Sequence, residues 1–373
     1  MARPVRYHAG QFPPRHLDWE VLIPLLGPTA AAVARYDGVL AAVPNPAVLL
    51  SPLTTQEAVL SSRIEGTQAT FDEVLTFEAE GESGNRSPER VADIQEVLNY
   101  RRSLREAERM MIKMPVWGPV ICSAHRLLME GVRGHGKEPG EYRRGPNWIG
   151  PPGCAIDDAR FIPIEAAQLP EAMAGWERYA NEEPADRMIQ LAILHAEFEA
   201  LHPFRDGNGR LGRMLVPLFL WKKGIIRAPV FYISAYLEAR REEYYARLLA
   251  VSRDADWTGW CRFFLGATRA QAENNHRKAS EILRLYESMK PRLREITRSQ
   301  YVVHALDWMF ERPIFKSSDF VESAGIPAPT AKRILQALKK SGVLAALTPG
   351  SGRRPAVLSF PDLLKIAEGE SVP

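Results

Sequence analysis

The residues of this chain best suited to chemistry lie in one short segment, from His202 to Arg213. Because an unperturbed imidazole titrates at about pH 6.5, His202 can act as a general base near neutral pH. Asp206 offers a hard oxygen ligand of the kind that Mg²⁺ binds beside phosphates. Arg210 and Arg213 lie three residues apart, so on a helix they share a face and can both reach phosphate oxygens.

Glycines in the same segment supply a site for the phosphates themselves. Gly207 and Gly209 free the backbone to bring N–H groups close to an anion. The pattern predicts a helix directly after them, whose N-terminal amides and dipole favour the same anion. Together these features indicate a phosphoryl- or nucleotidyl-transfer site. The alternative is a surface turn in which His202 caps a helix and both arginines are solvated, but the joint occurrence argues against it.

Helical periodicity, interrupted by prolines and glycines, predicts the elements that position this segment. Residues 18–43 predict one or two helices with a break at Pro24 and Pro28. A Gly- and Pro-rich stretch over 134–163 predicts a long loop with a small β-hairpin. Residues 300–373 predict the helix, short helix, helix and glycine-tipped hairpin of a winged helix-turn-helix. The fold class expected is therefore mainly α. The domains expected are an N-terminal helical region (1–88), a helical core (89–273), a connecting helix (274–299) and the winged helix-turn-helix (300–373).

Length and composition restrict the class of protein. The chain has 373 residues, of which 46% are hydrophobic and 25% charged, so two or three folded domains are expected. The net charge of +3 does not by itself indicate a nucleic-acid binder. No apolar run approaches the ~20 residues that span a bilayer, and the basic N-terminus lacks the apolar stretch of a signal peptide, so we expect a cytoplasmic protein. The three cysteines exclude a disulfide framework and a four-cysteine zinc site; they are Cys122, Cys154 and Cys261.

The segment from 202 to 213 also resembles the signature of the Fic family, H-x-F-x-[D/E]-G-N-G-R-x-x-R, with every fixed position matched. The resemblance implies a helical Fic core that transfers AMP from ATP to a hydroxyl of a target protein. It implies that His202 deprotonates a Ser, Thr or Tyr hydroxyl, that Asp206 holds Mg²⁺ and that Arg213 binds the γ-phosphate. The nucleotide-binding positions that it implies in this segment are Phe204, Arg205, Gly207, Asn208, Gly209, Arg210 and Arg213.

Two further stretches resemble parts of the same family. Residues 140–143, 147–150 and 161–163 are similar to its flap, a β-hairpin that presents backbone groups to an extended target segment. The alternative is a structural hairpin that covers the core. Residues 243–248 are similar to a helix whose tyrosine lines the adenine pocket, which implies Tyr244 or Tyr245, with Tyr245 preferred, although both are equally suited to a core. The flap residues that the resemblance implies are Asn147, Trp148, Ile149, Gly150, Phe161 and Ile162.

Residues 61–66 match the pattern [S/T]-x-x-x-E-[G/N], with Ser61, Glu65 and Gly66 at its fixed positions. This short pattern also fits an ordinary helix end, with Gly66 as the left-handed cap and Glu65 in solvent. In a chain with the core signature it resembles the inhibitory motif of the family. A carboxylate paired with Arg213 would remove the partner of the γ-phosphate, so ATP could not seat its α-phosphate for attack.

Basic residues are concentrated in the C-terminal region. Between residues 316 and 354 the chain has seven lysines and arginines but two aspartates and glutamates. A recognition helix with Lys332, Arg333 and Gln336 could enter a major groove, while Arg353 and Arg354 contact phosphates. The alternative is a protein-interaction or dimerisation module.

Three hypotheses follow from these patterns. The first is an autoinhibited protein adenylyltransferase that uses ATP and Mg²⁺, acts on target proteins and on itself, and forms a homodimer. The second is a DNA-binding regulator whose Fic core senses nucleotide or is silent. The third keeps the enzyme and changes its reaction to the use of another nucleotide donor or to the removal of AMP. Asn208 and Gly209 speak against a phosphotransferase, because the related kinases depart from the signature there.

Overall fold

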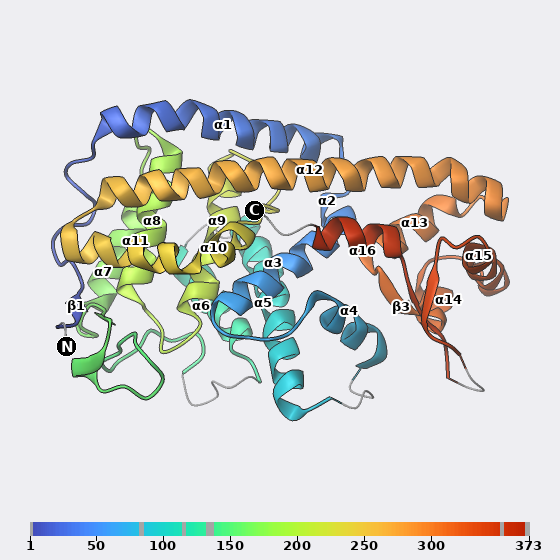
Figure 1. Cartoon of the computed structure of the whole chain (residues 1–373), viewed down its shortest axis with the longest axis horizontal. Coiled ribbons are helices and arrows are strands. Elements are labelled where there is room, and N and C mark those ends of the chain that lie inside the picture. Colours follow the sequence, from blue (N-terminus) through green and yellow to red (C-terminus); the bar gives the residue numbers. More distant parts are fainter. Residues whose placement is uncertain (1–2, 82–85, 114–116, 132–137, 351–353, 370–373) are drawn as a thin grey trace.

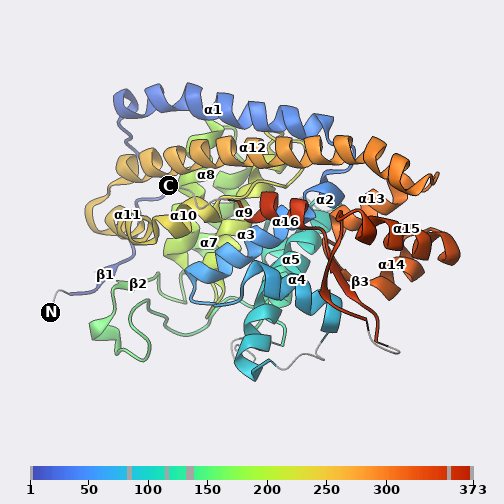
Figure 2. The same cartoon turned by 45° about the vertical axis from the view of Figure 1, so that its right-hand side comes forward.

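The protein is mainly helical in a computed structural model that describes residues 3–81, 86–113, 117–131, 138–350 and 354–369 (Figure 1). Two long helices, α1 (Trp19–Ala42) and α12 (Trp257–Thr297), lie side by side along one edge of the molecule in both views (Figure 2). Beneath them the remaining helices form the core. No helix of the described residues is long and apolar enough to cross a membrane.

The long helix α1 runs without a break through Pro24 and Pro28, so the expected interruption is absent. Asp18 caps its start, since its Oδ1 accepts hydrogen bonds from the N–H groups of Glu20 and Val21. The prolines cost two backbone hydrogen bonds, but they lie in the first half of a helix whose buried face packs along α12. Tertiary packing therefore outweighs the local signal.

Helix α12 is also continuous, over 41 residues, where the sequence analysis placed the end of the core at residue 273 and the start of a connecting helix at residue 274. The expected boundary between the core and the connecting helix thus lies inside one element. Its first half packs on α8 (Arg187–Leu201), and its C-terminal half extends to the C-terminal elements.

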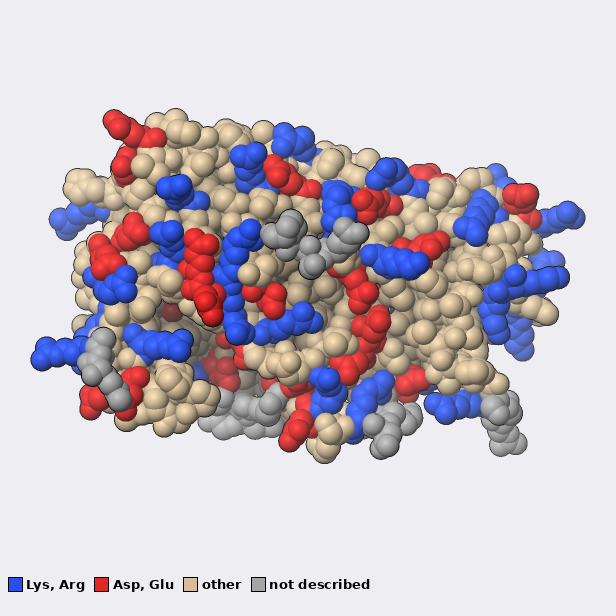
Figure 3. All heavy atoms as spheres, viewed as in Figure 1, with Lys and Arg blue, Asp and Glu red and all other residues tan. Residues whose placement is uncertain are grey.

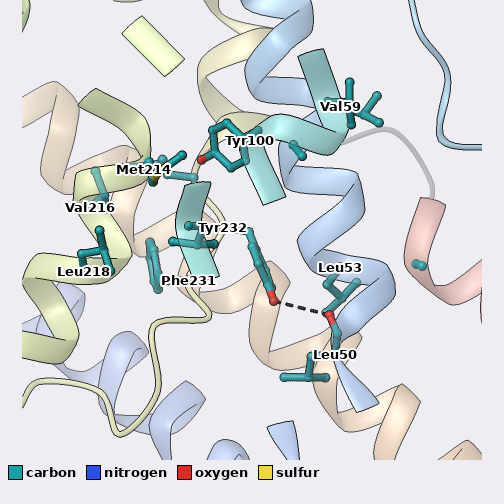
Figure 4. Packing of buried hydrophobic residues seen from close by; sticks show 14 of the residues in the cluster. Leu50, Leu53, Val59, Tyr100, Met214, Val216, Leu218, Phe231 and Tyr232 are labelled. Carbon is teal, nitrogen blue, oxygen red and sulfur yellow. Dashed lines mark hydrogen bonds between the residues drawn. The ribbon is translucent and has the colours of Figure 1, made fainter. Parts of the chain in front are cut away.

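The core of the molecule lies where helix α3 (Ser51–Ile64) packs against α5 (Pro88–Lys113) and α9 (Asn208–Lys222). Figure 4 shows Val59 of α3, Tyr100 of α5 and Met214 of α9 among the buried residues there. Because α3 packs against these helices, its C-terminal end lies beside the start of α9. The other core helices are α2 (Pro46–Leu49), α4 (Phe71–Glu80), α6 (Trp117–Leu128), α7 (Leu169–Asn181), α10 (Ser234–Ala239) and α11 (Arg241–Asp254).

The small β-hairpin expected within 134–163 is reduced, among the described residues, to one antiparallel bridge between Ile149 and Phe161; its role as a flap stays a prediction. Phe161 begins strand β2 (Phe161–Ile162), whose other edge pairs in parallel with strand β1 (Val5–Arg6). The N-terminal segment is therefore part of the flap, a contact that the sequence did not reveal. The buried His8 anchors this segment, with its ring 2.8 Å from a carboxylate oxygen of Glu197 on α8.

The C-terminal elements follow the order predicted from the sequence, with one additional strand and an additional helix at the end among the described residues. The added strand, β3 (Ile314–Lys316), pairs antiparallel with β5 (Val357–Ser359), which also pairs antiparallel with β4 (Ala345–Thr348). These elements contact the core directly, because β3 packs on α4 and the last helix packs on α3 and α12. The helices of this region are α13 (Val302–Glu311), α14 (Ser317–Ser323), α15 (Ala328–Lys340) and α16 (Pro361–Glu368).

Candidate active site

The geometry of the site begins with two residues of left-handed backbone conformation between α8 and α9. His202 caps the end of α8 with φ 48°, and its backbone N–H donates to the Phe198 carbonyl at 3.1 Å. Gly207 caps the start of α9 with φ 75°. A Cβ at Gly207 would lie 2.9 Å from the Met129 sulfur, so both the backbone angle and the packing require glycine there. We call residues 202–209 the site loop.

Asn208 closes the site loop on itself. Its Oδ1 accepts from the Phe204 N–H at 2.8 Å, and its Nδ2 donates to the Phe204 carbonyl at 2.8 Å. Phe204 is fully buried and stacks on the His125 ring, with 3.7 Å between the ring centroids. Asn208 therefore sets the shape of the loop, and Phe204 anchors it.

Two residues that hold the loop were not assigned a role from the sequence. His125 lies 3.0 Å from the Asp206 carbonyl, and its Nδ1 accepts from the Gly140 N–H at 2.8 Å. That acceptor role leaves the proton on Nε2, which donates to Asp206. The buried guanidinium of Arg143 donates to the carbonyls of His202 and Leu201 at the end of α8. A cation at that end also interacts favourably with the helix dipole.

The imidazole of His202 is neutral at physiological pH. Burial lowers its pKa from 6.5 to about 4, against smaller opposing effects of the Glu199 carbonyl and of Glu65. Its Nδ1 lies 3.4 Å from the Glu199 carbonyl. A neutral imidazole can accept a proton from a hydroxyl group, so the protonation state suits a general base.

Asp206 and Arg210 lie together at the start of α9. The Arg210 guanidinium is buried and pairs with Glu96 of α5 at 3.0 Å, and it lies 3.8 Å from the Asp206 carboxylate. Asp206 Oδ1 also accepts from the Gly207 N–H at 2.6 Å. The described residues contain no group of three or more His, Cys, Asp or Glu side chains arranged to hold a metal ion. A single carboxylate still fits Mg²⁺, which commonly takes one or two protein carboxylates and fills its shell with phosphates and water.

The site loop ends where an ion pair closes the first turn of α9. Arg213 is 1% exposed, and its guanidinium donates to the Glu65 carboxylate at 2.7 Å. Ser61 holds the same guanidinium through its hydroxyl at 2.9 Å and its carbonyl at 2.8 Å. Burial alone would lower the pKa of Arg213, but the neighbouring Glu65 carboxylate raises it overall. The predicted pairing is thus present in the geometry, with α3 bringing Ser61 and Glu65 to Arg213.

The Glu65 carboxylate also lies directly over Gly209. A Cβ at Gly209 would come within 2.2 Å of Glu65 Oε1, which puts the carboxylate beside the first turn of α9. An anion there is favoured by the helix dipole and by the free N–H groups of that turn. Glu65 therefore occupies the place that the sequence assigned to phosphates. Gly66 follows it with φ 101° and turns the chain away from α9.

A buried carboxyl group that the sequence did not single out lies behind this ion pair. Glu199 of α8 packs against Gly212, where a Cβ would lie 2.4 Å from its Oε1, an atom with no hydrogen-bond partner in the described part of the chain. Burial raises its pKa from 4.5 to about 8, against the opposing effect of Arg213. It could not be recognised from the sequence, because only the packing of α8 on α9 buries it.

The two tyrosines of α11 lie in different environments. Tyr244 is 1% exposed, with its hydroxyl 2.9 Å from His195 Nε2 and its ring among Trp260 and Phe263. Tyr245 is 41% exposed, and its hydroxyl donates to the Ile64 carbonyl at 3.4 Å, one residue before Glu65. Only Tyr245 is open to a ligand from solvent, and its role at an adenine ring stays a prediction.

The flap contacts the site loop through Arg143, through the Tyr142 ring, which lies 5.4 Å from the Phe204 ring between centroids, and through Asn147. Asn147 Nδ2 donates to the Phe204 carbonyl at 3.3 Å. Trp148 and Ile149 are exposed, and the Trp148 indole donates to the Cys154 carbonyl, which folds the intervening loop back on itself. Gly150 allows this fold, since a Cβ there would lie 2.6 Å from the Cys154 sulfur. Phe161 is buried, Ile162 is half-buried, and Arg205 points outward with an exposed pair to Glu138.

Two segments of the chain match known protein families. Residues 23–109 match the family described as Fic/DOC family N-terminal, and residues 119–220 match the Fic/DOC family. Over 209 residues the chain is 26% identical to a probable protein adenylyltransferase of Aquifex aeolicus, covering 55% of this chain and 59% of that protein. Over 177 residues it is 28% identical to the protein adenylyltransferase Fic of Drosophila ananassae, covering 46% of this chain and 32% of that protein.

The fold is shared with solved structures. A Fic family protein from Desulfovibrio desulfuricans superposes with a TM-score of 0.61 at 22% identity, covering 94% of this chain and 98% of that one. A Fic domain containing signaling protein from Bacteroides thetaiotaomicron gives a TM-score of 0.55 at 19% identity, covering 69% of this chain and 97% of that one. The chain therefore carries the N-terminal domain and the core domain of the Fic/DOC family.

Proposed function

We propose that the protein is an autoinhibited protein adenylyltransferase that transfers AMP from ATP to Ser, Thr or Tyr hydroxyl groups of target proteins and of itself. The names of the relatives support the transfer of adenylate. The observation that carries the inhibition is the Glu65–Arg213 ion pair at 2.7 Å, closed over the first turn of α9. The chain spans 59% of the Aquifex aeolicus protein and 32% of the Drosophila ananassae protein, so the activity proposed here rests on the site as well as on these relatives.

The residues of the site loop fit an in-line displacement at the α-phosphorus. Neutral His202 accepts the proton of the target hydroxyl, whose oxygen bonds to the α-phosphorus. The bond from that phosphorus to the bridging oxygen breaks, and pyrophosphate leaves. Backbone N–H groups of Asn208 and Gly209 in the first turn of α9 bind the phosphate oxygens, and Arg213 binds the γ-phosphate. Asp206 would hold Mg²⁺, whose charge neutralises the phosphates.

In this proposal the form described is the inhibited one, and the same contacts support it. Arg213 cannot pair with a γ-phosphate while Glu65 and Ser61 hold its guanidinium. The Glu65 carboxylate beside Gly209 would also repel a triphosphate in the first turn of α9. Transfer therefore requires that the end of α3 move or that Glu65 lose its charge.

The test is label transfer from α-labelled ATP with Mg²⁺, with the purified chain and with a cell lysate. We expect weak labelling by the wild type, strong labelling by Glu65→Gly and none by Glu65→Gly with His202→Ala. Glu165→Gly is the matched control, because Glu165 is exposed in the loop before α7 and forms no ion pair among the described residues. It should label as weakly as the wild type.

Measurements of ATP binding distinguish the inhibition by Glu65 from the catalytic role of His202. His202→Ala in the Glu65→Gly background should bind ATP as tightly as Glu65→Gly alone, because it removes only the base. If Glu65→Gly bound ATP no better than the wild type, the proposal that Glu65 inhibits the enzyme by blocking ATP would be wrong. If it bound ATP well yet transferred no label, removal of AMP or another nucleotide donor would replace the proposed reaction.

A further inference from the structure

Helix α15 presents two different faces. Its apolar side chains are buried against α12 and α14, while the exposed face carries charge and no exposed large apolar side chain. The buried residues are Ala331, Ile334, Leu335 and Leu338, and the exposed charged and polar ones are Lys332, Arg333, Gln336, Lys339 and Lys340. Figure 3 shows lysine and arginine side chains gathered at the end of the molecule where α15 lies.

A groove runs beside this face. It has a volume of about 670 Å³ and lies between α14, α15 and the start of β5. Lys332, Gln336 and Lys339 line it from α15, and Arg354 lines it from the chain before β5. Glu322 of α14 is the one carboxylate in its lining. We call this the C-terminal groove. Arg353, the other residue expected to contact phosphates, lies outside the described residues.

The cations of the C-terminal groove form no ion pairs with the described part of the chain. No ion pair joins Lys332, Lys339 or Arg354 to a carboxylate in the described part of the chain. Arginines on neighbouring α12 behave differently, since Arg269 and Arg277 each pair with a glutamate one turn away. The cations of α15 therefore contribute little to folding and leave a positive surface in need of an anionic partner.

We propose that the C-terminal groove binds duplex DNA, with α15 in the major groove and with Lys332, Lys339 and Arg354 in contact with phosphates. A helix of 13 residues is about 20 Å long, enough to lie along the major groove. Interfaces between proteins are depleted of lysine and rich in aromatic residues, whereas interfaces with DNA are strongly positive. The composition of this face favours DNA over a protein partner. The inference is independent of the transfer reaction.

The test uses the full chain and a fluorescein-labelled duplex of mixed sequence, about two helical turns long, followed by fluorescence anisotropy. We expect affinity to fall with salt, with a logarithmic slope of about −3 for three to four phosphate contacts. Lys332→Glu with Lys339→Glu should weaken binding more than tenfold and reduce the slope by about 2. Arg35→Glu with Arg262→Glu, an equal charge change at exposed arginines of α1 and α12, should leave binding near the wild-type value.

Three results would overturn the proposal. These are the absence of duplex binding at low salt, equal weakening by both double variants, and equal affinity for a single strand of the same sequence. A change in oligomeric state on Lys332→Glu with Lys339→Glu, without any DNA binding by the wild type, would assign the groove to a second copy of the chain instead. Circular dichroism of both double variants checks that each is folded.

Discussion

The site loop and the C-terminal groove use basic residues in opposite ways. In the site loop region, Arg143, Arg210 and Arg213 are buried, and each guanidinium donates to specific oxygens. In the groove, Lys332 and Lys339 are exposed and have no carboxylate partner among the described residues. A buried guanidinium has fixed partners, and replacing one of them changes the geometry of the site. Exposed cations instead create a positive electrostatic potential that attracts anions without fixing a geometry. Substitutions should therefore affect stability in the first region and affinity in the second.

The largest contrast is expected from Arg143→Met and Arg333→Met. Removal of the Arg143 guanidinium leaves the carbonyls at the end of α8 without donors and should lower the free energy of unfolding by about 3–5 kcal/mol. Arg333→Met on the exposed face of α15 should change it by less than about 0.5 kcal/mol. Urea unfolding of both variants measures the difference. Equal losses would show that the two regions do not differ as described.

A second pair compares two amide side chains. Asn208→Ala leaves the buried N–H of Phe204 without its acceptor and should cost about 2–3 kcal/mol. Gln336→Ala, on the exposed face of α15, should be nearly neutral in the same unfolding measurement. Transfer by the Glu65→Gly protein should also fall with Asn208→Ala, because the site loop loses its closure. A stable Asn208→Ala protein would mean that Phe204 alone sets the loop.

The sequence predicted the first of these regions more fully than the second, for a physical reason. His202, Asp206 and Arg213 lie close along the chain, so their spacing already places them on one loop and one helix face. Glu65 was also predicted, through a short pattern on a helix end. The sequence did not predict the roles of His125, Arg143 and Glu199. These residues act through contacts between segments that are distant along the chain, and such contacts leave no local pattern in the sequence. The parallel pairing of β1 with β2 escaped for the same reason.

The helix boundaries show the same limit. Pro24 and Pro28 predicted a break in α1, but the helix continues because its buried face packs along α12. Thr70 and Glu73, by contrast, are spaced three residues apart as in a capping box, and they form it with both reciprocal hydrogen bonds at the start of α4. A local pattern such as a helix cap predicts the structure correctly, because the neighbouring backbone satisfies it. A helix-breaking proline predicts it wrongly where tertiary packing stabilises the helix.

A third prediction uses the buried carboxyl group of Glu199. In the unfolded chain this group ionises near 4.5, and in the folded chain burial holds its proton up to about pH 8. The folded state therefore binds more protons over that window, so this group reduces stability as pH rises. Glu199→Gln removes the effect. Relative to the variant, the wild type should lose about 2 kcal/mol of unfolding free energy between about pH 6 and pH 8. Urea midpoints at both pH values provide the test, and parallel curves would contradict it.

The smallest expected effect concerns salt. The Glu65–Arg213 pair holds a guanidinium that is 1% exposed, so bulk ions screen it weakly. The ratio of label transfer by Glu65→Gly to that by the wild type should thus change by less than about twofold between about 50 mM and 200 mM salt. Over the same range, duplex binding at the C-terminal groove should weaken more than about tenfold, because it depends on released counterions. If this transfer ratio fell with salt as steeply as the duplex affinity, long-range charge, and not the buried Glu65–Arg213 contact, would maintain the inhibition.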